Sequence, residues 1–124
     1  MTLYCKAPNF NSEIPYYHAF IDKCASNYAG VFLEKSGYNV CYFDNDLERE
    51  KDEDIGLLAI INKSVLITSD VGFFNNHNYN KILLCRNRLV AAKVADTDNF
   101  NFKYKSMGLA WKNIARGMRW ILKG

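Results

Sequence analysis

The ten residues Val65–Phe74, VLITSDVGFF, place a carboxylate just behind an apolar run. The β-branched and aliphatic side chains of Val65–Thr68 are typical of a strand that is buried on both faces. Asp70 follows this run after one residue, Ser69. A similar pattern occurs earlier, because the apolar and aromatic run YHAFID, residues 17–22, also ends in a carboxylate. Both runs therefore predict a short strand that leads to an aspartate.

Helical patterns alternate with these strand-like runs. Apolar residues recur at helical spacing in residues 24–37, and Ser36–Gly37 supplies a helix stop signal. The elements predicted after the first strand are, in order, a helix over residues 24–37, a strand over Tyr38–Phe43, a helix over Asp52–Asn62, and strands over Val65–Thr68 and Lys81–Cys85. This alternation predicts an α/β fold, a three-layer α/β/α arrangement with a mostly parallel central sheet.

Length and composition favour one globular domain. The chain has 124 residues, of which 49% are hydrophobic and 23% charged, which separates it from disordered sequences. Residues 1–17 are expected to form an N-terminal arm, and residues 18–124 the domain. No apolar run is long enough to cross a bilayer, and the N-terminus lacks the features of a signal peptide. We therefore expect a cytoplasmic protein with no membrane association.

The charge is distributed unevenly along the chain. Residues 1–80 carry 6 Lys/Arg against 11 Asp/Glu, whereas residues 81–124 carry 10 against 2. An acidic half can hold cations, and a basic half can attract phosphates. The sequence SMGLAWKNIARGMRWILKG, residues 106–124, predicts an amphipathic helix whose apolar stripe packs on the sheet while its cations face water. The candidate nucleic-acid contacts in this half are Arg86, Arg88, Lys112, Arg116 and Arg119.

The cysteines and histidines predict no further site. Cys5, Cys24, Cys41 and Cys85 stand singly without a CxxC pair, so we expect reduced, mostly buried thiols that bind no metal. His18 and His77 have no partner that the sequence reveals, and a packing or solvent role is expected for both.

Several carboxylates are expected to meet at one edge of the sheet. Parallel strands end at the same edge, so Asp22 and Asp70 should project together, and the first turn of the next helix can bring Asp52, Glu53 or Asp54 to the same crevice. Clustered carboxylates favour a hard divalent cation such as Mg²⁺ or Mn²⁺. Each aspartate also has a structural explanation, as a helix cap, a turn residue or a complement to the helix dipole.

Three segments together resemble the small PIN-like nuclease domains, which are related to the toxins of bacterial toxin–antitoxin pairs and to the Mut7-C group. These segments are FIDKCASNYAGVFLEKSGYNV, DEDIGLLAIINKSVLITSDVGFF and KILLCR, within residues 19–86. The resemblance implies a three-layer α/β/α fold and Mg²⁺- or Mn²⁺-dependent cleavage of RNA. It also implies Asp22, Asp52 and Asp70 as metal ligands, with Asp54 as an alternative, and an antitoxin or a second copy of the chain as partner.

The chain departs from that pattern at two positions. Such domains usually carry a further acid soon after the first one, where this chain has Lys23 and Cys24, and another where it has Gly72. These departures favour a second hypothesis, a catalytically degenerate PIN-like domain that binds RNA or a protein partner without cleavage. A third reading, a small-molecule α/β domain, has no glycine-rich phosphate loop in its support.

Overall fold

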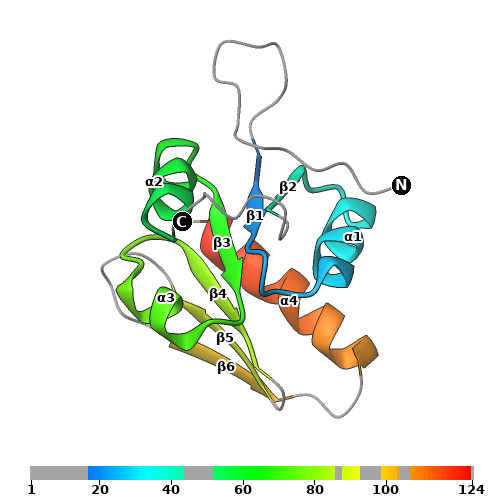
Figure 1. Ribbon diagram of the computed structural model, residues 1–124. Coiled ribbons are helices and arrows are strands. Elements are labelled where there is room, and N and C mark those ends of the chain that lie inside the picture. Colours follow the sequence, from blue (N-terminus) through cyan, green and yellow to red (C-terminus); the bar gives the residue numbers. More distant parts are fainter. Residues whose placement is uncertain (1–16, 44–51, 86–87, 93–98, 104–106, 124) are drawn as a thin grey trace.

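A computed structural model of the chain describes residues 17–43, 52–85, 88–92, 99–103 and 107–123 (Figure 1). The helices and strands in this part of the chain are, in order, β1 (Ala19–Ile21), α1 (Asn27–Lys35), β2 (Val40–Tyr42), α2 (Asp52–Ile61), β3 (Val65–Thr68), α3 (Val71–Asn76), β4 (Lys81–Leu84), β5 (Arg88–Ala92), β6 (Asn99–Lys103) and α4 (Met107–Leu122). The fold is therefore α/β, as expected.

The sheet has six strands in the order β2-β1-β3-β4-β5-β6 and is mixed. The strands β2, β1, β3 and β4 pair in parallel, whereas β4 with β5 and β5 with β6 pair antiparallel. The expectation of a mostly parallel sheet therefore needs correction. Only three residues separate β4 from β5, and the Cys85 N–H donates to the Arg88 carbonyl at 3.0 Å. So short a link joins only antiparallel neighbours, because a parallel crossover needs a dozen or more residues.

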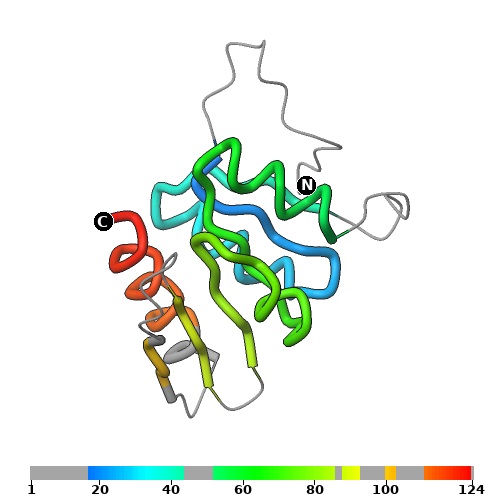
Figure 2. The backbone as a smooth tube through the Cα atoms, turned by 90° about the vertical axis from the view of Figure 1, so that its left-hand side faces the viewer, coloured from blue at the N-terminus to red at the C-terminus, as the bar shows by residue number. Residues whose placement is uncertain are grey.

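Helices cover both faces of this sheet. On one face, Ala19 and Ile21 belong to a core that includes Leu33 of α1 and Met118 of α4. On the other face, Phe20 packs with Ile55 of α2 and with residues of α3. Figures 1 and 2 show this division, with α4 and α3 on opposite sides of β4. The alternation of side chains along β1 therefore places successive residues in two different cores.

Local signals in α1 match the structure closely. The Ser26 hydroxyl accepts a hydrogen bond from the Tyr28 N–H at 3.2 Å, which caps the start of the helix. The helix ends at Lys35, and Gly37 follows with φ of 96°. A residue with a β-carbon would be strained in that left-handed conformation. The predicted helix stop at Ser36–Gly37 is confirmed.

The predicted C-terminal helix is also present, as α4. Its apolar stripe is buried at Ile114, Met118 and Ile121. Lys112, Arg116 and Arg119 are exposed. In the described part of the chain, no helix combines the length and apolar character needed to cross a membrane.

Two parts of the fold were not predicted from the sequence. Residues 69–80 were expected to be a polar loop but contain α3, which begins directly after Asp70. The strands β5 and β6 were not predicted at all, because their segments lack a clear apolar alternation. Except for Tyr17, the proposed N-terminal arm lies outside the described residues.

The cysteines correct two expectations. Cys24 and Cys85 are free thiols, as predicted, but Cys24 is exposed and Cys85 only half-buried. Cys41 is buried and disulfide-bonded. Disulfides are rare in cytosolic proteins, so this bond does not support the expected cytoplasmic location.

Candidate metal centre at the carboxyl edge of the sheet

Asp22 and Asp70 lie together at the carboxyl ends of β1 and β3. The strands are neighbours, and the Asp22 N–H donates to the Ile67 carbonyl at 2.9 Å. The Thr68 hydroxyl links the two aspartates, because it donates to Asp22 Oδ2 at 2.8 Å and accepts from the Asp70 N–H at 3.1 Å. Two residues 48 positions apart in sequence therefore share one site, as the parallel strands predicted.

The Asp22 carboxylate is buried and held by three donors. Its residue surface is 2% exposed. The Lys23 N–H donates to Oδ1 at 2.9 Å, while the Cys24 thiol and the Thr68 hydroxyl donate to Oδ2 at 2.9 and 2.8 Å. Such bonds replace the water that an ionised carboxylate loses on burial. Counting donors from the described residues alone, one acceptor position on Oδ1 remains, since each carboxylate oxygen can accept two hydrogen bonds.

Asp70 is the N-cap of α3. Its Oδ1 accepts a hydrogen bond from the Phe73 N–H at 3.2 Å, which explains why the strand ends in a carboxylate and a short helix follows. Within the described residues, its second oxygen accepts no hydrogen bond. Asp70 is exposed, so that oxygen is accessible from outside.

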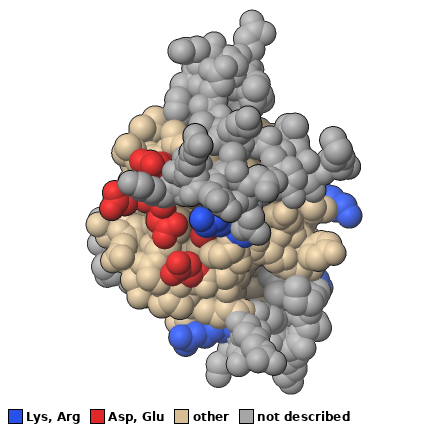
Figure 3. Space-filling view, in the orientation of Figure 1, with Lys and Arg blue, Asp and Glu red and all other residues tan. Residues whose placement is uncertain are grey.

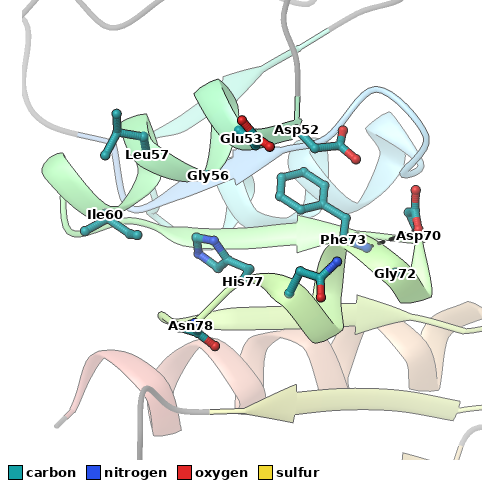
Figure 4. Close-up of a pocket in the computed structure, with 11 residues that line it drawn as sticks. Asp52, Glu53, Gly56, Leu57, Ile60, Asp70, Gly72, Phe73, His77 and Asn78 are labelled. Carbon is teal, nitrogen blue, oxygen red and sulfur yellow. Dashed lines mark hydrogen bonds between the residues drawn. The ribbon is translucent and has the colours of Figure 1, made fainter.

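Asp52 in the first turn of α2 reaches the same place. Partial burial of its carboxyl, together with the negative charges of Asp22 and Asp70, raises the pKa of Asp52, whereas the Lys23 ammonium acts in the opposite direction. Like charges interact in this way only when they are near one another. We call Asp22, Asp52 and Asp70 the aspartate cluster. Figure 4 shows Asp52 above the ring of Phe73 and Asp70 to the right of that ring.

Cys24 contacts this cluster through its thiol, although the residue is exposed. Desolvation and its hydrogen bond to Asp22 raise the pKa of the Cys24 thiol, so the sulfur stays protonated and acts as a donor. Its sulfur also lies 3.4 Å from the Thr68 hydroxyl. The Cys24 sulfur therefore lies against both Asp22 and Thr68.

The remaining predicted site residues are distributed over the molecule. Asp54 is exposed and does not line the groove beside the cluster, although Glu53 does. Arg88 lies at the same edge as the aspartates, because it precedes Leu89, which pairs with Leu84 at the carboxyl end of β4. Arg86 lies outside the described residues. Lys112, Arg116 and Arg119 belong to α4, on the other face of the sheet.

The donor chemistry of the cluster suits a hard divalent cation. Across residues 17–43, 52–85 and the other described segments, no group of three or more His, Cys, Asp or Glu residues is placed to hold a metal ion. Mg²⁺ keeps several waters in many protein sites and is held there by one or two carboxylates. Asp52 and Asp70 offer accessible oxygens for that role, and Asp22 offers one remaining acceptor position. Figure 3 shows acidic side chains gathered on this face.

A groove of about 780 Å³ extends from the cluster between α2 and α3. Its acidic end holds Asp52, Glu53 and Asp70, and its other end is more apolar (Figure 4). The residues that line it are Asp52, Glu53, Gly56, Leu57, Ile60, Asp70, Gly72, Phe73, Asn76, His77 and Asn78. Thr68, which links Asp22 and Asp70, does not line this groove. The sequence offered one signal for its role, since a polar side chain at the end of a fully buried strand needs a hydrogen-bond partner.

His77 forms the floor of this groove. A β-carbon on Gly56 would lie 3.1 Å from His77 Nδ1, so the glycine in α2 allows the imidazole to approach the helix. His77 Nε2 is buried and has no hydrogen-bond partner among the described residues. Burial, assisted by the charge of Lys81, lowers the pKa of His77 to about 4. The ring is therefore neutral at physiological pH.

The low pKa of His77 predicts a pH dependence of stability. In the unfolded chain a histidine has a pKa near 6.5, whereas the pKa of His77 in the folded protein is about 4. Between these two pH values the unfolded chain binds more protons than the folded protein does. We expect the free energy of unfolding to fall across this range by up to about 3 kcal/mol more than in a His77→Gln variant. Urea titrations of both proteins at several pH values measure the difference. Parallel curves for the two proteins would contradict the prediction.

Comparison of the chain with protein-family models, curated proteins and solved structures finds no match. The resemblance to PIN-like domains consequently rests on the residues described above, and the function is argued from the site itself.

Proposed function

We propose that this chain is a PIN-like, Mg²⁺- or Mn²⁺-dependent ribonuclease. One observation carries the proposal: Asp22 and Asp70 share the carboxyl edge of the sheet, and Asp52 lies near enough that their charges, after partial burial, raise the pKa of its carboxyl. Open α/β sheets bind their ligands at this edge. Clustered carboxylates without a bound cation repel one another, so a divalent ion relieves a repulsion that the fold creates.

The residues of the cluster have different tasks in this proposal. Asp52 and Asp70 hold the ion through their accessible oxygens, and Asp22 completes the set from its buried position. The bound cation lowers the pKa of a water and stabilises the negative charge that develops on the phosphate. Arg88, at the same edge, positions a phosphate of the RNA backbone. The carboxylates alone would repel that backbone, because both carry negative charge.

The test is a cleavage assay with the purified chain and a 5′-labelled single-stranded RNA. We expect cleavage in Mn²⁺ or Mg²⁺ and none in EDTA. Cleavage that persists in EDTA, or that is absent in both metals, would contradict the proposed activity. As a related proposal, the ribonuclease is the toxin of a toxin–antitoxin pair, and an antitoxin or a second copy of the chain is its partner.

A second candidate function is a domain of the same kind that binds RNA or a protein without cleaving it. It is favoured by the surroundings of Asp22, whose carboxylate is buried and already bonded to three donors of the chain. A neutral thiol at Cys24 stands where another carboxylate would strengthen metal binding. In this case divalent ions should not change the melting temperature of the protein.

A Cys24→Asp variant separates the two functions. The new carboxylate would lie beside Asp22, so the variant should melt at a lower temperature than the wild type in EDTA, because the two charges repel. Mn²⁺ should restore the melting temperature of the variant. It should also bind the variant at least about tenfold more tightly than it binds the wild type, because an additional negatively charged ligand strengthens the site. Isothermal titration and thermal melts measure both effects. Cys24→Ser is the matched control, since it keeps a donor to Asp22 and adds no charge.

The two functions differ in what the wild type does with Mn²⁺. A nuclease raises its melting temperature with Mn²⁺ before any substitution, whereas a binder gains this response only as Cys24→Asp. No response to Mn²⁺ in either protein would show that the aspartate cluster is not a metal centre.

A further inference from the structure

A second groove lies between α1 and α4, on the face of the sheet opposite α2 and α3. Figure 1 shows these two helices side by side. The groove has a volume of about 400 Å³ and is lined by Phe32, Ser36, Lys112, Asn113, Ala115, Arg116 and Arg119. We call it the basic groove, because three of its seven lining residues are cationic and none is acidic.

The three cations of the basic groove have no carboxylate partner in the part of the chain that the structure describes. Lys112, Arg116 and Arg119 are exposed, and none forms an ion pair with a carboxylate among the described residues. They follow one another at helical spacings of four and three, so their charges lie on one side of α4. Like charges at such spacing destabilise a helix by about 0.2–0.5 kcal/mol per pair. Arg119 complements the helix dipole in the last turn, but Lys112 and Arg116 lie too far from it.

An aromatic side chain accompanies these charges. Phe32 lines the basic groove, and its ring stacks on that of Trp111 with centroids 6.3 Å apart and an interplanar angle of 26°. Trp111 itself packs against the core. The ring of Phe32 is therefore held in place. Sites that bind single-stranded nucleic acid combine cations along the phosphate backbone with aromatic rings on which the bases stack. The basic groove contains both kinds of side chain.

The topology separates this groove from the aspartate cluster. α1 connects the carboxyl end of β1 to the start of β2, and these strands are parallel. Its last turn and Ser36 consequently lie at the amino edge of the sheet, whereas Asp22 and Asp70 lie at the carboxyl edge. The basic groove also occupies the opposite face from α2. A ligand can therefore bind there without touching the aspartates.

We propose that the basic groove binds a single strand of nucleic acid, with Lys112, Arg116 and Arg119 on consecutive phosphates and a base against Phe32. A membrane surface fits poorly, because the apolar stripe of α4 is already buried in the core. The inference goes beyond the proposed ribonuclease, since it concerns a different site and does not require cleavage.

The test measures binding in EDTA, where no metal-dependent cleavage takes place. Fluorescence anisotropy follows 5′-fluorescein-labelled RNA and DNA strands of about 12 nucleotides, between about 50 and 200 mM salt. The triple variant Lys112→Gln, Arg116→Gln, Arg119→Gln should bind at least about tenfold more weakly. The slope of log K against log salt should also fall by about 2, because each lost phosphate contact on a single strand removes about 0.7.

Phe32→Leu provides a different signature. It keeps an apolar side chain against the core but removes the stacking surface, so binding should weaken by about fivefold to a hundredfold with an unchanged salt slope. Thermal melts establish that each variant is folded. Lys63→Gln, an exposed cation at the end of α2 on the other face, is the matched control and should bind as the wild type does.

The outcomes distinguish a nucleic acid from an anionic membrane as the source of the phosphates that the basic groove binds. The proposal is supported if the wild type binds RNA more tightly than DNA, or binds both equally, and if the triple variant loses this binding. The proposal is overturned if the triple variant binds as the wild type does, if Lys63→Gln weakens binding equally, or if only anionic vesicles containing phosphatidylserine are bound. Binding without any Mn²⁺-dependent cleavage would support the basic groove and reject only the proposed ribonuclease.

Discussion

Asp70→Asn is expected to reduce Mn²⁺-dependent RNA cleavage at least about a hundredfold while the protein remains folded. The neutral amide is a poorer ligand for a hard cation than the carboxylate is, and it leaves less negative charge to hold the ion. A bound ion contributes several kcal/mol to stabilising charge in the transition state, and each 1.4 kcal/mol corresponds to a factor of ten in rate. Single-turnover cleavage of a labelled RNA measures the rate.

The fold should tolerate this substitution because of the second role of Asp70. Its Oδ1 caps α3 by accepting from the Phe73 N–H, and asparagine is as good an N-cap as aspartate. The melting temperature should therefore stay close to that of the wild type. Ser69→Ala, at the neighbouring exposed position, is the control and should cleave normally. Unchanged cleavage by Asp70→Asn would exclude the aspartate cluster as the catalytic site.

Asp22→Ala is expected to lower the free energy of unfolding by about 3 kcal/mol. The substitution removes the acceptor for three hydrogen bonds and leaves the Thr68 hydroxyl, which is 0% exposed, without its carboxylate partner. A buried donor without an acceptor costs about 1–3 kcal/mol. For a domain whose total stability is about 5–15 kcal/mol, this is a large fraction. Chemical denaturation of both proteins at pH 7 gives the difference.

Two further variants show whether the effect comes from these hydrogen bonds. Asp54→Ala removes an exposed aspartate and should cost less than about 1 kcal/mol, the range for a charge in the first turn of a helix. A double-mutant cycle of Asp22→Ala with Thr68→Val should show a coupling of at least about 1 kcal/mol. Equal losses for Asp22→Ala and Asp54→Ala would contradict the role assigned to the buried carboxylate.

The same residue type therefore serves different purposes at the two strand ends. Asp70 is exposed and is expected to tolerate replacement by asparagine, whereas Asp22 is buried and accepts three hydrogen bonds that hold the fold together. In the proposed metal centre, Asp70 contributes mainly to ion binding. Asp22 links ion binding to the packing of β1 against β3.

Much of the candidate site could be predicted because it depends on strand direction. Once VLITSD and YHAFID are recognised as strands of one parallel sheet, Asp22 and Asp70 must leave it at the same edge. The first turn of α2 follows β2 and reaches that edge as well. The bonds from Cys24 and Thr68 to Asp22 could not be predicted, because they depend on how individual side chains are oriented once β1 and β3 have paired.

The sequence also did not reveal that the groove beside the aspartate cluster and the basic groove lie on opposite faces of the sheet. The sequence showed that α4 carries cations on one side, but not that they gather with Phe32 in a groove away from the aspartates. The antiparallel strands β5 and β6 and the short helix α3 were missed. The helix α3 begins at the Asp70 cap, and β5 and β6 are held by antiparallel pairing with β4 and with each other. A pattern of hydrophobic residues reveals neither feature.

The amino-acid sequence by itself determined the α/β class, the strands that end in Asp22 and Asp70, the stop of α1 at Gly37, and the amphipathic character of α4. These features follow from hydrophobic periodicity and from the conformational preferences of single residues, which act locally. Only the tertiary structure decided which aspartate is buried, where the sheet becomes antiparallel, and which cations share a groove. Those properties arise when segments far apart in the chain exclude water from one another, so no local pattern contains them.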